Sequence, residues 1–299
     1  MHEVVEWLNR DERHCHRIDA ILYEEDTSVQ NVKIVRLARY GLSLLLNDRV
    51  QSTQFDEKIY HEGIVLPAYL ARDEMQNVLC VGGANGGIIR EIMKCPSVDS
   101  IEMIDIDRNA FEICREHLPH MFAGVDWSND IRLRFGDVRN LLRGIKGPFD
   151  VIFNDVADAI SDTAAVGFYT EEHFRKLKDT LGPGGILVTQ AGPVEHIYGH
   201  FFCAVRDTLA TLFLTTAAYL LDIPSYGLPW GFILASDAPI AFESSCIRAK
   251  LAALSSSPDS YDEEAHRRNF SLPYVIRKRL QRQGPIISLN QPMLTFERA

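Results

Sequence analysis

From residue 77 onward, short apolar segments alternate with amphipathic segments of helical period. The apolar segments read NVLCVGG, SIEMIDID, IRLRFGD, FDVIFND and GILVTQAG. Between them, RNAFEICREHL and TEEHFRKLKDTL carry their apolar residues on one helical face. Apolar strands that alternate with amphipathic helices predict a parallel sheet covered by helices on both faces. This feature restricts the chain to the α/β class of folds.

Two further segments complete the predicted sheet. The strands expected at 215–223 and 230–237 are joined around PSYGLP, which predicts a hairpin and a Rossmann-like, methyltransferase-type sheet of seven strands. Residues 17–53 show alternation and β-branched residues, which indicate a small antiparallel unit. We therefore expect an N-terminal β-strand domain at 1–72 and a Rossmann-like nucleoside-binding catalytic domain at 73–299.

Composition and charge exclude several function classes. The formal net charge of −10 argues against a nucleic-acid partner, because such binding needs a basic surface. We find neither an apolar run of about 18 residues nor an apolar signal-peptide core, so we expect no membrane partner and a cytoplasmic location. The six cysteines show no CxxC spacing, and no metal site is predicted.

A glycine-rich turn follows the first strand of the predicted sheet. It contains Gly82, Gly83, Asn85 and Gly86. Glycines at this position let the backbone approach a ligand closely at a helix N-terminus. The turn lacks the Lys-Ser/Thr of a phosphate-binding loop, so we do not expect it to cradle phosphates.

Acidic residues follow the next strands at the same edge of the sheet, where ligands of open α/β sheets bind. Asp105 is placed to accept hydrogen bonds from two ribose hydroxyls, and Asp137 from an adenine amino group. Asp107 is equally well explained as the N-cap of the following helix. Asp155 and Asp158 end the fourth strand, where paired carboxylates can attract a cationic acceptor and take its proton. Together these positions predict an adenosine site beside an acceptor site.

These residues, in this order, resemble the spermidine synthase (polyamine aminopropyltransferase) family over most of the chain. NDRVQS at 47–52 and FDEKIYHE at 55–62 are similar to the signature at the family's domain junction. IPSY with WGF at 223–232 and YDEEAHRRNFSLPYV at 261–275 are similar to later family segments. TQAGP at 189–193 is closer to thermospermine synthases.

The resemblance implies roles for individual residues and an assembly. Gln51 and His61 would contact the nucleoside, Asp105 its ribose and Asp137 its adenine, and Asp155 would be the catalytic base. The acceptor pocket would be lined by Tyr60, Asp158 and Tyr226. Independently of the resemblance, Tyr226 and Trp230 can stack on the aromatic acceptor of a methyltransferase, although aromatic residues that pack within the sheet are the commoner case. The family's N-terminal strands commonly build a dimer interface, which implies a homodimer.

Asn85 departs from the family's pattern, in which an acid at this position binds the ammonium group of decarboxylated S-adenosylmethionine. Intact S-adenosylmethionine adds a carboxylate, which an acid would repel and an amide would accommodate. We therefore predict an S-adenosylmethionine-dependent methyltransferase acting on an amine or an activated aromatic acceptor such as an indole. The alternative is a thermospermine- or spermidine-forming aminopropyltransferase that uses decarboxylated S-adenosylmethionine. A catalytically inactive nucleoside-binding subunit is a third hypothesis, to which Asn85 and Ala159 point.

Overall fold

The N-terminal part of the chain forms a five-stranded antiparallel sheet. A computed structural model describes residues 2–127, 130–160, 164–240, 242 and 244–296. The sheet is ordered as the chain runs, and neighbouring strands pair antiparallel. Its strands are β1 (His2–Trp7), β2 (Arg13–Asp26), β3 (Asn31–Leu37), β4 (Gly41–Leu46) and β5 (Arg49–Thr53). The antiparallel unit predicted over residues 17–53 begins earlier in the structure, which adds β1 and starts β2 at Arg13.

A seven-stranded mixed sheet follows, in the order β11-β12-β10-β9-β6-β7-β8. The strands are β6 (Asn77–Gly82), β7 (Ser100–Asp105), β8 (Asp130–Phe135), β9 (Phe149–Asp155), β10 (Leu181–Pro193), β11 (Thr215–Asp222) and β12 (Pro229–Ser236). Strands β6 to β10 pair in parallel, whereas β12 lies antiparallel to both of its neighbours. The predicted α/β class, the seven strands and the terminal hairpin are confirmed.

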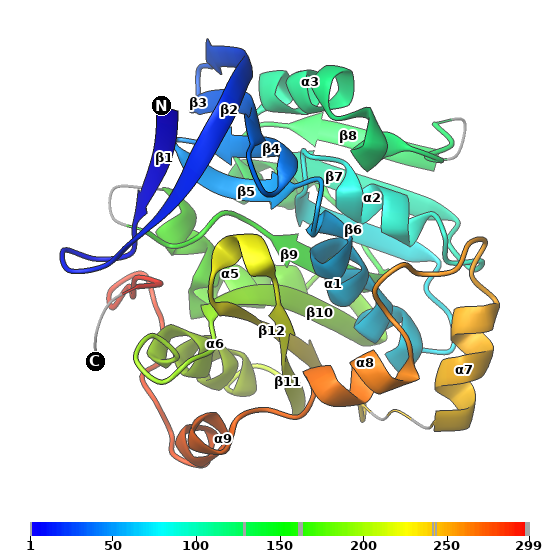
Figure 1. Cartoon of the computed structure of the whole chain (residues 1–299). Helices are drawn as coiled ribbons and strands as arrows, with labels where there is room; N and C mark the ends of the chain where they lie inside the picture. Colours follow the sequence, from blue (N-terminus) through cyan, green and yellow to red (C-terminus); the bar gives the residue numbers. More distant parts are fainter. Residues whose placement is uncertain (1, 128–129, 161–163, 241, 243, 297–299) are drawn as a thin grey trace.

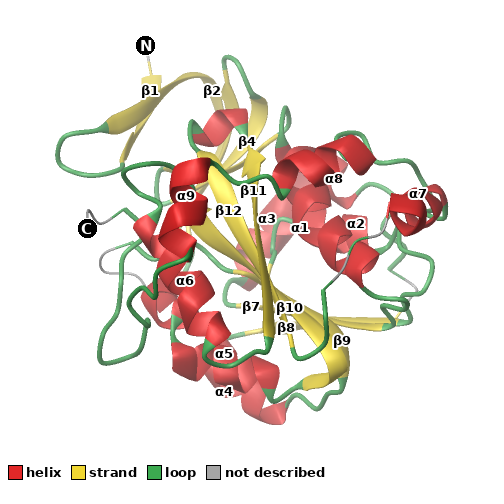
Figure 2. Cartoon of the chain, turned by 90° about the horizontal axis from the view of Figure 1, so that it is seen from below, coloured by secondary structure: helices red, strands yellow, loops and turns green. Residues whose placement is uncertain are grey.

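Helices cover both faces of this sheet (Figure 2), with α1, α2, α7 and α8 on one side and α4, α5, α6 and α9 on the other. The helices are α1 (Glu57–Ala71), α2 (Gly87–Ile92), α3 (Arg108–His117), α4 (Val138–Leu141), α5 (Glu171–Lys178), α6 (His200–Ala210), α7 (Ser244–Ala252), α8 (Glu263–Asn269) and α9 (Tyr274–Leu280). Among the described residues, none of the helices is long and apolar enough to cross a membrane.

Side-chain alternation along the central strand explains the two helical layers. In β6, Val78 and Cys80 belong to one apolar core, and Leu79 and Val81 belong to the other. All four side chains are completely buried. A strand that is apolar on both faces needs a layer on each side, so β6 lies at the centre of the sheet.

The chain order reverses beside β6, because β7 pairs on one side of it and β9 on the other. In open α/β sheets, ligands bind in the crevice at such a reversal, outside the carboxyl ends of the strands. The N-terminal sheet lies over this part of the molecule, and β5 leads directly into α1 (Figure 1). The crevice is therefore roofed by the N-terminal domain.

Candidate active site

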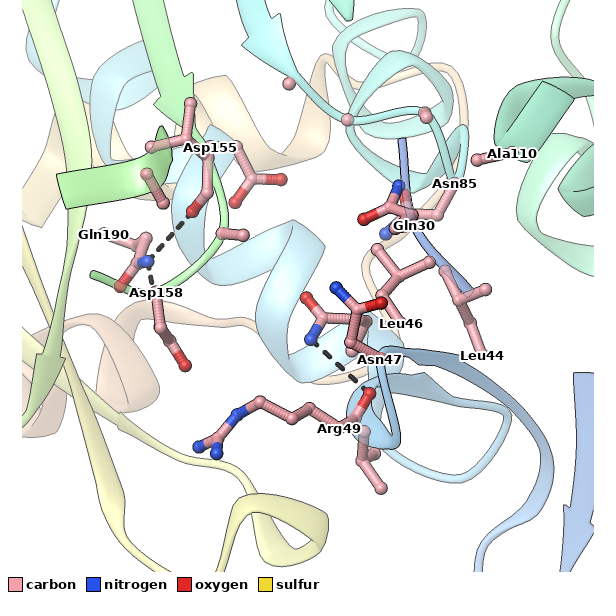
Figure 3. Close-up of a pocket in the computed structure, with 18 of the residues that line it drawn as sticks. Gln30, Leu44, Leu46, Asn47, Arg49, Asn85, Ala110, Asp155, Asp158 and Gln190 are labelled. Carbon is pink, nitrogen blue, oxygen red and sulfur yellow. Dashed lines mark hydrogen bonds between the residues drawn. The ribbon is translucent and has the colours of Figure 1, made fainter. Parts of the chain in front are cut away.

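A cavity of about 370 Å³ lies between the N-terminal sheet and the carboxyl ends of β6, β7 and β9. Figure 3 shows Asp155, Asp158 and Gln190 on one side of it and Gln30 and Asn85 on the opposite side. Ten of the predicted site residues line the cavity: Gln51, Tyr60, Gly82, Gly83, Asn85, Asp105, Asp155, Asp158, Tyr226 and Trp230. The three that do not line it are His61, Gly86 and Asp137.

Asp105 is held against the glycine-rich turn at the end of β7. One carboxylate oxygen accepts the Ala84 N–H at 3.1 Å, and the other accepts the Asp107 N–H at 3.0 Å. Burial raises the pKa of Asp105 to about 6, although these backbone bonds oppose the shift. Asp107 caps α3 by accepting the Ala110 N–H, so the N-cap interpretation of that residue holds. The Asp105 carboxylate thus lines the cavity in a fixed orientation.

The glycine-rich turn needs glycine for two reasons. Gly82 has φ +88° and Gly83 has φ +93°, in the region that side chains disfavour. A Cβ atom on Gly82 would also overlap the carbonyl oxygen of Asp155, its register partner on β9. Asn85 completes the turn, because its Oδ1 accepts the Gly87 N–H at 3.0 Å. The Asn85 side chain therefore has a structural function in the turn.

His61, Gly86 and Asp137 lie around the cavity without lining it. His61 is 1% exposed beneath the turn, and its Nδ1 lies 2.8 Å from the Glu57 carboxylate. Gly86 packs against Phe122. Asp137 accepts the Arg139 N–H at 2.9 Å and pairs with the guanidinium of that residue. Nucleoside contacts by His61 and Asp137 remain predictions.

Asp155 lies at the centre of the cavity wall, at the end of β9. The Tyr60 hydroxyl, from α1, donates a hydrogen bond to its carboxylate. Burial raises the pKa of Asp155, and the Tyr60 bond and the nearby His61 oppose this. Burial also raises the pKa of Tyr60 well above its usual value, so Tyr60 remains a hydrogen-bond donor. A carboxylate with a raised pKa in a cavity is suited to accept a proton.

Gln190, which sequence analysis did not single out, organises the wall next to Asp155. Its Oε1 accepts from the Trp230 indole N–H and the Gly192 N–H, both at 3.0 Å. Its Nε2 donates to Asp158 Oδ1 at 3.2 Å and to the carbonyl oxygen of Val156 at 3.0 Å. Because the donors and acceptors around it are fixed, the amide has one satisfactory orientation. Gln190 thereby holds both Asp158 and Trp230.

Tyr226 closes this wall from the turn between β11 and β12. Its hydroxyl donates to the Gln51 carbonyl oxygen at 2.8 Å, and its ring meets Trp230 edge-on at 5.0 Å. Burial raises the pKa of Asp158, and Arg49 opposes the shift. The predicted acceptor residues are therefore brought together around a partly buried carboxylate.

Among the other cavity residues that were not predicted from the sequence are Glu6, Arg49 and Phe296. Arg49 stands inside the NDRVQS motif, which offered a signal for it. Glu6 and Phe296 come from the two ends of the chain, where no motif or periodic pattern marks them. Only the folded arrangement brings these residues together.

The mixed seven-stranded sheet, the N-terminal β domain and the roofed crevice define a Rossmann-like α/β enzyme. The chain belongs to the spermine/spermidine synthase family and is accordingly a transferase. The model of the spermine/spermidine synthase domain matches residues 57–244, and the model of the spermidine synthase tetramerisation domain matches residues 5–54.

Curated relatives and solved structures agree with this assignment. The chain is 31% identical over 294 residues to a polyamine aminopropyltransferase of Sulfolobus acidocaldarius, with 97% of each chain covered. It is 32% identical to polyamine aminopropyltransferase 2 of Hyperthermus butylicus, with 92% of this chain and 91% of the relative covered. The crystal structure of spermidine synthase from Thermotoga maritima superposes with a TM-score of 0.82 at 24% identity, with 94% of each chain covered, which supports the fold.

These findings overturn the methyltransferase prediction. It depended on Asn85, which was interpreted as a sign of a donor that carries a carboxylate. The relatives are named aminopropyltransferases, and they favour the alternative. The structure supplies the physical reason: Asn85 Oδ1 is used by the turn itself, as acceptor for the Gly87 N–H. An amide at this position therefore says little about the charge of the donor.

Proposed function

We propose that this protein is a polyamine aminopropyltransferase that moves the aminopropyl group of decarboxylated S-adenosylmethionine to a primary amine. The observation that carries the proposal is the pair Asp155 and Asp158, two carboxylates that line one cavity with different partners. Their negative charge suits a cationic amine acceptor better than a neutral aromatic one. The names of the relatives support the same reaction.

In the proposed reaction the amine lone pair attacks the aminopropyl carbon that is bonded to the sulfonium. The new C–N bond forms as the C–S bond breaks, and the C–S electron pair stays on sulfur, leaving neutral methylthioadenosine. The nitrogen then carries a positive charge and loses one proton to Asp155, whose raised pKa suits this role. Sulfur loses its charge in the transition state, so the leaving group needs no acid.

The remaining residues would position the two substrates. Asp105 would accept hydrogen bonds from the ribose hydroxyls, at the edge of the glycine-rich turn. Asp158, which Gln190 holds, would bind a second ammonium group of the acceptor. Alignment of the two reacting atoms is the main contribution of such a site, because the displacement needs an in-line geometry.

We also propose that the N-terminal domain assembles a homotetramer. The match of residues 5–54 to a spermidine synthase tetramerisation domain supports four copies instead of the expected two. Light scattering after size-exclusion chromatography tests this, and a mass of two chains at assay concentrations would contradict it.

The reaction is tested by incubating the protein with a donor and an amine, and following methylthioadenosine and the new polyamine by chromatography and mass spectrometry. We expect equal amounts of both products from decarboxylated S-adenosylmethionine and none from the intact nucleoside. Putrescine and spermidine are the acceptors to try first. Methylated amine made from intact S-adenosylmethionine, without aminopropyl products, would overturn the proposal.

A further inference from the structure

Arg49 places a fixed positive charge in the cavity that is proposed to bind a cationic acceptor. It is the first residue of β5 and lines the cavity. Figure 3 shows its side chain reaching across the pocket toward the side on which Asp158 lies. Asp158 and Arg49 interact electrostatically, because Arg49 lowers the pKa of that carboxyl against the effect of burial. The positive charge of Arg49 therefore lies at the end of the cavity that contains Asp158, which is the end proposed to bind the acceptor.

The Arg49 side chain is held by segments from both ends of the chain. Its Nη1 donates to the Trp7 carbonyl oxygen, at the end of β1, at 3.2 Å. Its guanidinium lies 5.4 Å from the centre of the Phe296 ring, in the C-terminal segment, within the range of a cation–π contact. Phe296 is itself buried against Trp230 and Tyr198. The charge is thus held in place by the fold.

Glu6 faces Arg49 at the same end. Its side chain is 11% exposed. Burial raises the pKa of Glu6 to about 7, and Arg49 and the Val50 backbone oppose this. His14 also faces Arg49, and burial and then Arg49 lower the pKa of that imidazole. Arg49 thus acts on both carboxylates at this end, Glu6 and Asp158, and Glu6 also lies 3.7 Å from His16 Nε2.

We propose that Arg49 is a specificity-determining residue that limits the length of the amine acceptor, admitting a diamine and disfavouring a triamine. The inference rests on the proposed function and names the acceptor class of the same site. A diamine places one nitrogen at Asp155 and its ammonium at Asp158. A triamine in the same orientation carries a further positive charge beyond Asp158, toward the guanidinium. Like charges at short range in a partly buried site repel strongly.

The test compares putrescine and spermidine as acceptors for the wild-type protein and three variants. Arg49→Met removes the charge and keeps an apolar stem of similar length. We expect it to raise the ratio of kcat/KM for spermidine over that for putrescine by at least about tenfold. Arg49→Lys keeps the charge and should leave this ratio within about threefold. Glu6→Gln leaves Arg49 uncompensated and should lower the ratio at about pH 8.5, where Glu6 is ionised.

Calorimetric binding of the same two amines, with methylthioadenosine present, gives a second readout that needs no turnover. We expect the two dissociation constants to shift in the same sense as the kinetic ratio. As a control, Arg132→Met removes an exposed guanidinium that pairs with Asp130 on β8. It should change neither the ratio of the two kcat/KM values nor the ratio of the two dissociation constants. Unchanged ratios in Arg49→Met, or equal changes in Arg49→Met and Arg49→Lys, would overturn the inference. Absence of product with both amines in the wild-type protein would instead overturn the proposed function.

Discussion

Asp155 and Asp158 stand three positions apart and have different hydrogen-bond donors, Tyr60 and Gln190. We expect Asp155→Asn to lower kcat by about two to four decades, the usual range for a general base. Calorimetry should find donor binding nearly unchanged. Asp158→Asn is the matched control and should mainly raise KM for the amine. Equal losses of kcat in both variants would contradict this division of roles.

Asn85 offers a test of how the glycine-rich turn senses the donor. An aspartate can still accept the Gly87 N–H. By the resemblance to the family, it would add a negative charge close to the donor's ammonium group. We expect Asn85→Asp to bind decarboxylated S-adenosylmethionine about tenfold more tightly, relative to the intact nucleoside, in competition calorimetry. Asn85→Ala loses the bond to Gly87 and should weaken both donors. An unchanged donor ratio in Asn85→Asp would show that residue 85 does not sense donor charge.

At the scale of elements, α1 and α2 are joined by a buried network of charges. Glu57 on α1 accepts from Arg90 Nη2 on α2 at 2.7 Å, and lies 2.8 Å from His61. Burial acts to raise the pKa of Glu57, but His61 and Arg90 outweigh it and lower the pKa to about 2. A carboxylate whose pKa is lower in the folded protein stabilises the fold at pH values above its pKa in the unfolded chain. This stabilisation is lost as the pH falls toward the pKa in the folded protein.

This network predicts a pH-dependent stability. The contribution of Glu57, at most about 3 kcal/mol, should be complete near neutral pH and decline between about pH 4.5 and pH 2. The difference in the free energy of unfolding between the wild type and Glu57→Gln, measured with urea, should therefore narrow over this pH window. Glu171→Gln removes a partly exposed pair with Arg175 and serves as the control. If this difference in the free energy of unfolding stayed constant with pH, the ionised network could not be its source.

Elements with a clear period could be predicted from the sequence, and elements without one could not. The strands of the seven-stranded sheet could be predicted because their apolar runs alternate with amphipathic helices. α1 was not, because it is buried nearly all round and contains Pro67, so no single apolar face marks it. β1 is short and carries two glutamates, and its pairing with β2 is not visible in its own composition. The domain boundary expected between residues 72 and 73 stays a prediction.

At the scale of the whole molecule, the C-terminal segment 284–296 returns to the cavity. The Ile287 N–H donates to Thr208 Oγ1 at 2.9 Å, and the Thr295 N–H donates to the Ala159 carbonyl oxygen at 2.7 Å, next to Asp158. Cavity residues that follow strands in motifs, such as Asn85, Asp105 and Asp155, could be predicted from the sequence. Glu6 and Phe296 could not, since they reach the cavity only through β1 and through this return.

Removal of residues 285–299 should therefore affect one substrate more than the other. We expect KM for the amine to rise by about tenfold or more, because the ring beside Arg49 and the support of Ala159 are lost. The dissociation constant for the nucleoside should change little. Phe296→Ala, a milder variant, should change KM in the same direction. A truncated protein that loses nucleoside affinity as strongly as amine affinity would contradict this role.

The meeting of β1 and the C-terminal segment at one cavity has a practical consequence for protein engineering. Glu6, near the start of the described chain, and Phe296, at the end of it, line the same pocket. An affinity tag fused to either end would start within a few residues of Glu6 or Phe296 and should be cleaved before kinetics are measured.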